Sequence, residues 1–238
     1  MKMLFDLHTH TISSGHAYST LQENAARAAE IGLEVLGMSD HAPKMPGSTI
    51  PYFFGNMKII PEKISGVRIL KGCELNIMGI DGSIDLYGSI LEGLEYTIAS
   101  LHPPCIAPSE NINDNTEALI NVMNNPKVNI IGHPGDPRYP IDVKKVVECA
   151  IKTNTLLEIN NTSLRPGGAR EGGEETVREI VRECKKRNYP VIFGSDAHIS
   201  FEIGDYSYIY NTLRDISLPE ELILNTSVEN LKKFGIMN

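Results

Sequence analysis

Seven short apolar runs recur along the chain, and most of them are continuously apolar rather than alternating with polar residues. Strands that are covered on both faces have this pattern, because neither side of the sheet meets water. We therefore predict buried strands at residues 3–7, 34–38, 67–72, 96–100, 128–131, 155–159 and 190–194.

Helical patterns fill several of the intervals between these strands. Each follows a residue that commonly precedes a helix, and we predict helices over residues 21–31 after Ser19 or Thr20, 116–123 after Asp114, 143–152 after Asp142, and 174–187 after Gly173. A closing helix is predicted over 227–234, with Ser227 as its cap and Gly235 as its stop. Strands and helices that alternate, with roughly 30 residues between successive strands, are typical of βα units that close into a barrel. We predict an α/β fold, a TIM-like (β/α)7 barrel, in a single domain over residues 1–238.

Charge and composition narrow the possible partners. The chain carries 30 acidic and 22 basic residues, for a formal charge of −8. Such a surface repels the phosphates of a nucleic-acid backbone, whereas a small phosphorylated substrate stays compatible with a site that binds cations. No apolar run approaches the roughly 20 residues that span a membrane, so we expect a cytoplasmic protein without membrane contact. The four cysteines are far apart, and we expect reduced thiols.

The seven histidines of the chain follow a common pattern. Each lies in a short motif that ends or directly follows an apolar run, and the set is His8, His10, His16, His41, His102, His133 and His198. Glu74 and Asp196 occupy equivalent places after the third and seventh runs. Because parallel barrels carry their chemistry at the carboxyl ends of the strands, we expect these side chains to meet at one rim. Imidazoles and carboxylates bind divalent cations, so the pattern predicts a polynuclear metal site.

Spacing assigns roles to some of these groups. His8 and His10, two residues apart on an extended chain, point to the same side and can reach one ion. A carboxylate can bridge two cations, and Glu74 is our candidate for that bridge. Asp6 and Asp40 precede histidines of the set, and an orienting hydrogen bond to an imidazole is one interpretation for either, with a polar place at the barrel rim as the alternative for Asp6.

Polar residues outside the histidine motifs are candidates for contact with the substrate. Glu158 and Asn160 follow the sixth run, and we interpret them as groups that orient the ligands or face the substrate. The glycine-rich loop 165–173 carries Arg165 and Arg170, which either meet a substrate phosphate or belong to a mobile solvated loop.

The irregular segment 43–61 is the other long interruption between strands. It carries side chains that suit a cover over a bound substrate, namely Tyr52, Phe53, Phe54 and Lys58. A specificity lid is therefore one interpretation of this segment.

Six motifs, in this order, resemble the PHP family, which is named for polymerase and histidinol phosphatase domains. They are Asp-Leu-His-Thr-His-Thr, Gly-His-Ala-Tyr-Ser-Thr, Ser-Asp-His, Gly-Cys-Glu-Leu-Asn, Gly-His-Pro-Gly and Gly-Ser-Asp-Ala-His. Within that family the chain resembles the small stand-alone YcdX-like phosphatases, and the similarity covers nearly its whole length. The resemblance implies a distorted seven-stranded barrel that holds three divalent metal ions, usually zinc.

The resemblance also implies which residues hold each ion. One ion would be bound by His8, His10, Glu74 and Asp196, a second by His16, His41 and His133, and the third by Glu74, His102 and His198. A three-histidine site with an open position suits Zn²⁺, while Mn²⁺ and iron stay compatible with these ligand types. Pro103 and Cys73 depart from the family pattern beside His102 and Glu74, and they bear on substrate fit more than on metal binding.

The expected activity is that of a metal-dependent phosphoesterase, which hydrolyses small phosphate monoesters through a metal-bridging hydroxide. The catalytic residues would be Glu74, Asp196 and His10, with Arg165, Arg170 and Asn160 at the substrate. The leaving oxygen would take its proton from Asp196 or from a metal-bound water.

Three alternatives stay open at this point: a histidinol-phosphate phosphatase, a nuclease or nucleotide phosphatase, and a metal-binding module without catalysis. The acidic surface disfavours a nuclease, and so does His16, where nuclease-like relatives tend to carry aspartate. A complete set of ligands disfavours the non-catalytic module. The relatives also imply a homo-oligomer, a trimer.

Overall fold

The computed structural model describes residues 1–237. Its sheet runs in the order β1-β2-β4-β5-β6-β7-β8, with every neighbouring pair parallel, and a short strand β3 lies antiparallel to β4. The strands are β1 Phe5–Asp6, β2 Val35–Met38, β3 Lys63–Ile64, β4 Val67–Asn76, β5 Tyr96–Ser100, β6 Ile130–Ile131, β7 Leu156–Asn160 and β8 Ile192–Gly194. Each parallel strand falls on one of the predicted apolar runs. All of their residues are buried except Arg68 and Lys71 of β4, which confirms the interpretation of these runs as covered strands.

The two ends of the sheet meet and make it a nearly closed barrel. Thr9, just after β1, pairs in parallel with Ala197, just after β8. The amide of His10 donates to the carbonyl of Ala197 at 2.9 Å, and the amide of Ala197 donates to the carbonyl of His8 at 3.3 Å. We call this contact between residues 8–10 and 195–198 the seam. The predicted distorted seven-stranded barrel of α/β type is confirmed.

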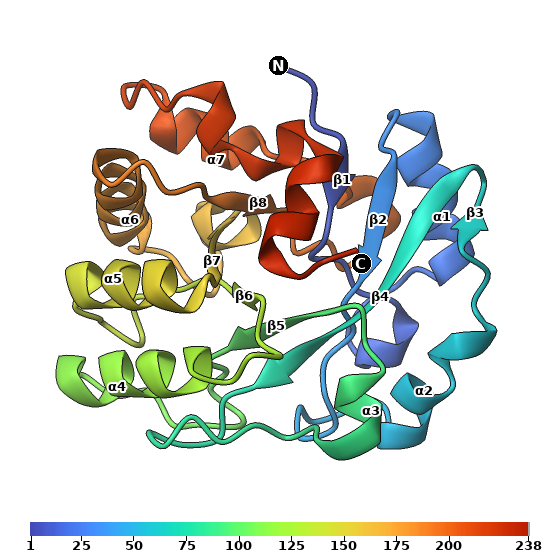
Figure 1. The fold of residues 1–238 in the computed structure, drawn as a ribbon, viewed down its shortest axis with the longest axis horizontal. Coiled ribbons are helices and arrows are strands. Elements are labelled where there is room, and N and C mark those ends of the chain that lie inside the picture. The colour runs from blue at the N-terminus through green and yellow to red at the C-terminus, as the bar shows by residue number, and fades with distance from the viewer. Residues whose placement is uncertain (238) are drawn as a thin grey trace.

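Four longer helices cover the outside of the barrel: α1 Leu21–Glu30, α4 Ile112–Met123, α5 Val143–Thr153 and α6 Glu174–Lys186. In Figure 1, α4, α5 and α6 stack along one side, and α1 lies on the other. Thr20 and Glu23 form a capping box at α1, and Asp142 caps α5 as predicted. Helix α4 begins a turn earlier than predicted, because Asn111 rather than Asp114 accepts the hydrogen bonds of its first amides.

The remaining elements are short. They are α2 Pro51–Gly55, α3 Gly88–Glu92, α7 Ser207–Leu213 and the 3-10 helices η1 Ile12–Ser14, η2 Met57–Ile59, η3 Thr162–Leu164, η4 Ser200–Glu202, η5 Glu220–Leu222, η6 Leu224–Thr226 and η7 Val228–Phe234. The predicted closing helix is η7, a 3-10 helix that follows Ser227 and ends at Gly235, whose φ is 70°. Over residues 1–237, no helix has both the length and the apolar character that crossing a membrane requires.

Tyr96 ties several strands together at the centre of the core. Its hydroxyl donates to the carbonyl of Leu7 at 2.7 Å, which links the start of β5 to the end of β1. The ring packs directly on the backbone of Gly72. Any side chain there would collide with it, because a Cβ on Gly72 would lie 2.3 Å from a ring carbon. A Cβ on Gly37 would lie 2.3 Å from the hydroxyl. The phenol of Tyr96 therefore fills the space that two glycines leave open, and it is fully buried there.

Candidate metal centre

The nine residues expected as metal ligands meet at the carboxyl end of the barrel. They follow β1, β2, β5, β6 and β8, while Glu74 lies inside β4 rather than past its end. The reason is that β4 continues to Asn76 and pairs with β5 over this stretch, with Glu74 opposite Ile98. Seven of the nine residues are at most 4% exposed. His16 is exposed and the side chain of His198 is 25% exposed, so the centre opens to solvent beside these two histidines.

Glu74 lies at the middle of the cluster. Its Oε1 is 3.3 Å from His8 Nε2, 3.2 Å from His102 Nε2 and 3.1 Å from His133 Nε2. Its Oε2 is 2.7 Å from His41 Nδ1 and 3.6 Å from His10 Nε2. The two oxygens thus face different imidazoles, which is the arrangement that a bridging carboxylate needs.

The pKa of Glu74 is held well below its ordinary value. Burial by itself raises the pKa of this carboxyl, but the nearby imidazoles of His102, His8 and His41 outweigh it. Ser100 adds a hydrogen bond, with its Oγ donating to Oε1 at 2.7 Å. Glu74 is therefore an ionised carboxylate, as a bridging ligand must be.

His8, His10 and Asp196 of the seam and Glu74 of β4 surround one point. Asp196 Oδ1 is 3.5 Å from His8 Nε2 and 3.3 Å from His10 Nε2, while Glu74 presents Oε1 to His8 Nε2 at 3.3 Å and Oε2 to His10 Nε2 at 3.6 Å. Four tetrahedral ligands at the usual zinc distances of about 2.0–2.2 Å keep their atoms about 3.3–3.6 Å apart. The distances from Asp196 Oδ1 to the two imidazole nitrogens fall in this range, so these three groups are spaced as ligands of one ion.

Buried polar atoms without hydrogen bonds mark the same place. The candidate ligands supply five of them, which are His8 Nε2, His10 Nε2, His41 Nδ1, His102 Nε2 and Glu74 Oε2. A buried polar atom with no partner costs free energy, and such atoms are rare in folded proteins. Divalent cations would satisfy all five at once, so the residues present fit metal ions.

The other histidines gather in two groups around this point. His41, Glu74 and His102 offer ligand atoms within 4.8 Å of one another, and the ring of His133 lies 5.2 Å from that of His102. His10, His41 and His198 form another such group, and His198 Nε2 lies 3.0 Å from His16 Nε2.

These proximities differ from the grouping that the resemblance implied, which joined His133 to His16 and His41, and joined His198 to His102 and Glu74. Strand order gives the reason. His133 follows β6, the neighbour of the strand β5 that leads to His102. His198 follows β8, which meets β1 at the seam, so it lies beside His16.

Most of the buried histidines are oriented by a second partner. His8 Nδ1 lies 2.6 Å from Glu158 Oε1, and the amide of His133 donates to Glu158 Oε2 at 2.8 Å. His10 Nδ1 lies 3.0 Å from Ser14 Oγ, whose proton goes to Asp40 Oδ1 at 2.7 Å. Glu158 therefore orients the ring of His8 and holds the main chain of His133, as one of the two sequence interpretations had it. The bonds to Nδ1 of His8 and His10 leave their Nε2 atoms to face the centre.

Asp6 and Asp40 do not make the direct hydrogen bond to an imidazole that was one interpretation of each, and Asp6 instead matches its alternative, a polar place at the barrel rim. Asp40 acts through Ser14, a residue that the sequence analysis missed. Asp6 accepts from backbone amides instead, those of His8, Ser195 and Gly204 at 3.0–3.3 Å, and so it is a satisfied polar group near the seam. The three amides engage both oxygens of Asp6, Oδ1 from His8 and Ser195 and Oδ2 from Gly204.

Electrostatics divide the histidines into different protonation states. Burial lowers the pKa of His8, but the carboxylates of Glu158, Glu74 and Asp196 outweigh it and hold that pKa well above the ordinary value. Burial and neighbouring histidines hold the pKa of His10 well below its ordinary value. Burial lowers the pKa of His102 to about 4. Neutral imidazoles such as His10 and His102 are ready to bind a metal without first losing a proton.

Two candidate ligands have left-handed backbone conformations. The φ of His133 is 31° and that of Asp196 is 56°, in a region that residues other than glycine seldom adopt. Such conformations cost about 1–3 kcal/mol and concentrate at functional sites. They turn both side chains inward directly after strands β6 and β8.

The three expected substrate residues differ in where they lie. Arg170 Nη1 donates to Asp196 Oδ2 at 2.9 Å, and its side chain is 15% exposed, so it is anchored at the centre. Arg165 pairs with Glu202 and lies 6.0 Å from the ring of Tyr208, and its side chain is 40% exposed. Asn160 is 1% exposed, and its amide nitrogen lies 3.0 Å from Glu158 Oε2 and 3.3 Å from Asp196 Oδ2. Its polar atoms are used inside the protein.

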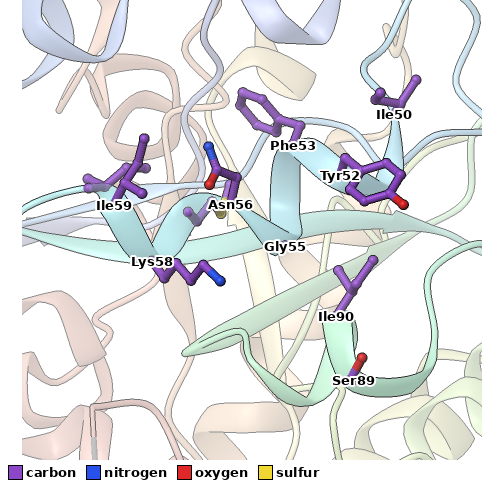
Figure 2. Close-up of a pocket in the computed structure, with 11 residues that line it drawn as sticks. Ile50, Tyr52, Phe53, Gly55, Asn56, Lys58, Ile59, Ser89 and Ile90 are labelled. Atoms are coloured by element: carbon purple, nitrogen blue, oxygen red, sulfur yellow. The ribbon is translucent and has the colours of Figure 1, made fainter.

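The segment 43–61 forms α2 and η2. A pocket of about 850 Å³ opens between this segment and the start of α3, and Figure 2 shows Tyr52, Phe53 and Lys58 on one side of it with Ser89 and Ile90 on the other. Phe54 is buried in the core and takes no part. No histidine or carboxylate lines this pocket, so it has no place in the metal centre.

The chain is similar to known proteins in sequence and in fold. The PHP domain model matches residues 6–164. A protein of Clostridium acetobutylicum named "probable phosphatase" is 49% identical over 99% of this chain and 97% of its own length. Another of that name, from Caldanaerobacter subterraneus, is 49% identical over 98% of this chain and 91% of its own length. The solved structure of a histidinol phosphate phosphatase from Lactococcus lactis, complexed with zinc, L-histidinol and phosphate, aligns with a TM-score of 0.60 at 15% identity, covering 91% of this chain and 95% of its own.

Proposed function

This chain belongs to the PHP domain family and is a phosphatase of that family, and we propose that it hydrolyses small phosphate monoesters with three divalent ions held at the histidine and carboxylate cluster. The observation that carries the proposal is Glu74, a buried carboxylate whose two oxygens face different imidazoles, in a cluster with five buried polar atoms that lack partners. In a barrel that binds no cation, these buried polar atoms would stay without partners, at a cost in free energy.

The ions would supply Lewis acidity, since they lower the pKa of a coordinated water to near neutrality and offset charge on a phosphate. We assign His8, His10, Glu74 and Asp196 to one ion, Glu74, His102 and His133 to a second, and His16, His41 and His198 to a third. Zinc fits the nitrogen-rich ligand sets, and Mn²⁺ or iron are compatible.

The chain's own residues would bind and orient the phosphate. Arg170 keeps its Nη2 free of the hydrogen bonds that hold Nη1 on Asp196, so this nitrogen can donate to a phosphate oxygen at the centre. Glu74 and His10 would hold the ions, and Asp196 would do the same while it anchors Arg170. We no longer propose Asn160 as a substrate contact, because its amide is committed to Glu158 and Asp196.

The proton for the leaving oxygen is better supplied by water than by Asp196. Burial raises the pKa of Asp196, but His8, His10 and Arg170 outweigh it and hold that pKa well below its ordinary value. Asp196 is therefore a carboxylate near pH 7 and has no proton to give. Water in the opening beside His16 and His198 would serve instead.

We take residues 1–238 as one PHP domain, although the family match ends at residue 164. The support is that Asp196 and His198, which follow β8, join the ligands that follow β1 across the seam. The trimer and the cytoplasmic location stay predictions.

The test compares kcat/KM for histidinol phosphate and for a generic aryl phosphate, with chelator-treated protein as control and with the metal content measured in the same samples. We expect metal-dependent turnover of both substrates within a factor of about 10³. A preference for histidinol phosphate beyond that factor, about 4 kcal/mol of discrimination, would move the proposal to the alternative that the Lactococcus structure represents. No turnover of either by the metal-loaded protein would overturn the proposed function.

A further inference from the structure

Asp85 lies in the loop between β4 and α3 and is 9% exposed. It accepts hydrogen bonds from three donors. The amide of Lys44 donates to Oδ2 at 2.8 Å, the amide of Asn76 donates to Oδ1 at 2.9 Å, and the Asn76 side-chain amide donates to Oδ2 at 2.7 Å. Its carboxylate thus joins the end of β4 to the start of segment 43–61. In the sequence, Asp85 lies 11 residues after Glu74, outside the motifs of the candidate ligands.

These contacts fix which way the Asn76 amide points. Its Nδ2 donates to Asp85 Oδ2 and to the carbonyl of Ala42, at 2.7 and 3.2 Å. Both partners can only accept, so the nitrogen must face them and Oδ1 must face the other way. There it lies 2.8 Å from His102 Nδ1.

The orientation of Asn76 decides the tautomer of His102. An amide oxygen only accepts, so the proton of a neutral His102 must sit on Nδ1 and leave the lone pair on Nε2. Nε2 is the atom that lies 3.2 Å from Glu74 Oε1 and has no hydrogen-bond partner. If the Asn76 amide turned over, its NH₂ would face Nδ1 and favour the opposite tautomer.

We propose that Asp85 is a positioning residue of the metal centre, which acts through Asn76 to hold His102 in the tautomer that binds metal. The inference rests on the metal centre of the proposed function. The same order of groups occurs at His10, where Asp40 holds Ser14 and Ser14 contacts the ring nitrogen. Each of these aspartates also holds a backbone amide outside the candidate ligands, Asp40 that of Thr11 and Asp85 that of Lys44.

The first test replaces Asp85 by asparagine, which keeps the size of the side chain but cannot accept all three hydrogen bonds. Partners of metal-binding histidines typically contribute 10–100-fold to metal affinity. We expect Asp85→Asn to weaken the binding of one ion by about 10–100-fold, measured by competition of the whole protein with a zinc-binding dye. Asp81→Asn is the matched control, because Asp81 lies exposed in the same loop and accepts only from Ser83 within its turn. The control should keep the affinity of the unaltered protein.

A reversed pair separates positioning from general stability. In the double variant Asn76→Asp/Asp85→Asn, the carboxylate at position 76 accepts from His102 Nδ1, and the amide at position 85 donates to that carboxylate. We expect this variant to regain most of the zinc affinity that Asp85→Asn loses. It should remain less stable to heat than the unaltered protein, because the bond from the Lys44 amide is weakened. In metal-free protein, imidazole ¹⁵N shifts of His102 should report Nδ1–H in the unaltered chain and a mixture of tautomers in Asp85→Asn.

Three results would overturn the inference: unchanged zinc affinity in Asp85→Asn, an equal loss in Asp81→Asn, or a reversed pair that binds zinc no better than the single variant. If Asp85→Asn fails to fold, the reversed pair and the ¹⁵N shifts of the unaltered protein still decide the matter. Zinc binding that follows these expectations in a protein without phosphatase activity would overturn the proposed function alone.

Discussion

Glu158 is the residue on which two candidate ligands depend at once. One of its oxygens contacts the ring of His8, while the other accepts from the amide of His133 and from Asn160. The left-handed backbone of His133 is held in part by that bond. A single carboxylate thus orients one ligand by its side chain and another by its main chain.

We expect Glu158→Gln to lose about 10–100-fold in metal affinity, because a glutamine keeps one acceptor oxygen but turns an amide nitrogen toward donors. The free energy of unfolding should fall by about 1–3 kcal/mol, the cost of a buried group that loses its partner. Zinc titration and urea unfolding measure the two effects. Glu179→Gln, exposed on α6, serves as control, and an equal response in both variants would contradict the assignment.

Glu74→Ala tests the bridge directly. We expect turnover to disappear and more than one ion to be lost from the purified protein, since the two oxygens of Glu74 serve different groups of imidazoles. Metal counting by mass spectrometry, with the isosteric Glu74→Gln beside it, is the measurement. A variant that keeps its full metal count and its activity would rule out the bridging role.

The pKa of His102 gives a prediction for metal-free protein. Burial lowers this pKa to about 4 from an ordinary 6.5, although Glu74 works in the opposite direction. The unfolded chain therefore takes up this proton before the native state does. The contribution of His102 to stability is complete above pH 6.5 and is lost as the pH falls through about 4. An NMR titration of the ring should give a midpoint well below 6.5, and an unshifted midpoint would count against the buried, neutral imidazole.

At the scale of elements, the parallel strands were predictable because each is buried on both faces and leaves a continuous apolar run. Even β6, with only Ile130 and Ile131, lies in a longer run of that kind. The length of β4 was not predictable, because Glu74 and Asn76 are polar and look like residues past a strand end. They remain in the strand because β5 pairs with them.

That the candidate ligands lie together could likewise be predicted from their motifs, while their grouping within the cluster could not. The sequence places His133 and His198 after two strands, but which ion each serves depends on the neighbours of those strands in the closed barrel. The partners Ser14, Asn76 and Ser100 were missed as well. Each is a small polar residue of a common type, and only contact in space distinguishes it from any other.

The contact between β4 and β5 predicts an intolerance at Gly72. A methyl group there would lie 2.3 Å from the ring of Tyr96, which is itself fully buried and cannot move aside freely. We expect Gly72→Ala to lower the free energy of unfolding by about 1–3 kcal/mol, the usual cost of overpacking. Urea unfolding measures it, and Gly55→Ala in α2, where the nearest atom is 3.7 Å away, is the matched control. Equal stability of the two variants would contradict this account of the packing.

At the scale of the whole molecule, the proposed metal centre and the closure of the barrel share one location. His8, His10 and Asp196 border the few backbone bonds of the seam, so an ion bound at this point would also join the two ends of the sheet. Binding at about 1,000 times the dissociation constant stabilises the folded state by about 4 kcal/mol, or about 8–16 °C in Tm for a chain of this size. Calorimetry with and without a chelator should show this difference and its reversal by added zinc. An equal Tm with and without metal would show that metal binding does not stabilise the fold.

The seam also has a mechanical meaning. Residues 8–10 lie near one end of the chain and residues 195–198 lie toward the other, so a force applied to the two termini acts across this contact. Because only a few backbone hydrogen bonds join the two ends of the sheet there, bound ions would add mechanical resistance to the opening of the barrel. Pulled in an optical trap, the metal-loaded protein should hold to a higher force than the stripped protein and then give way in one step.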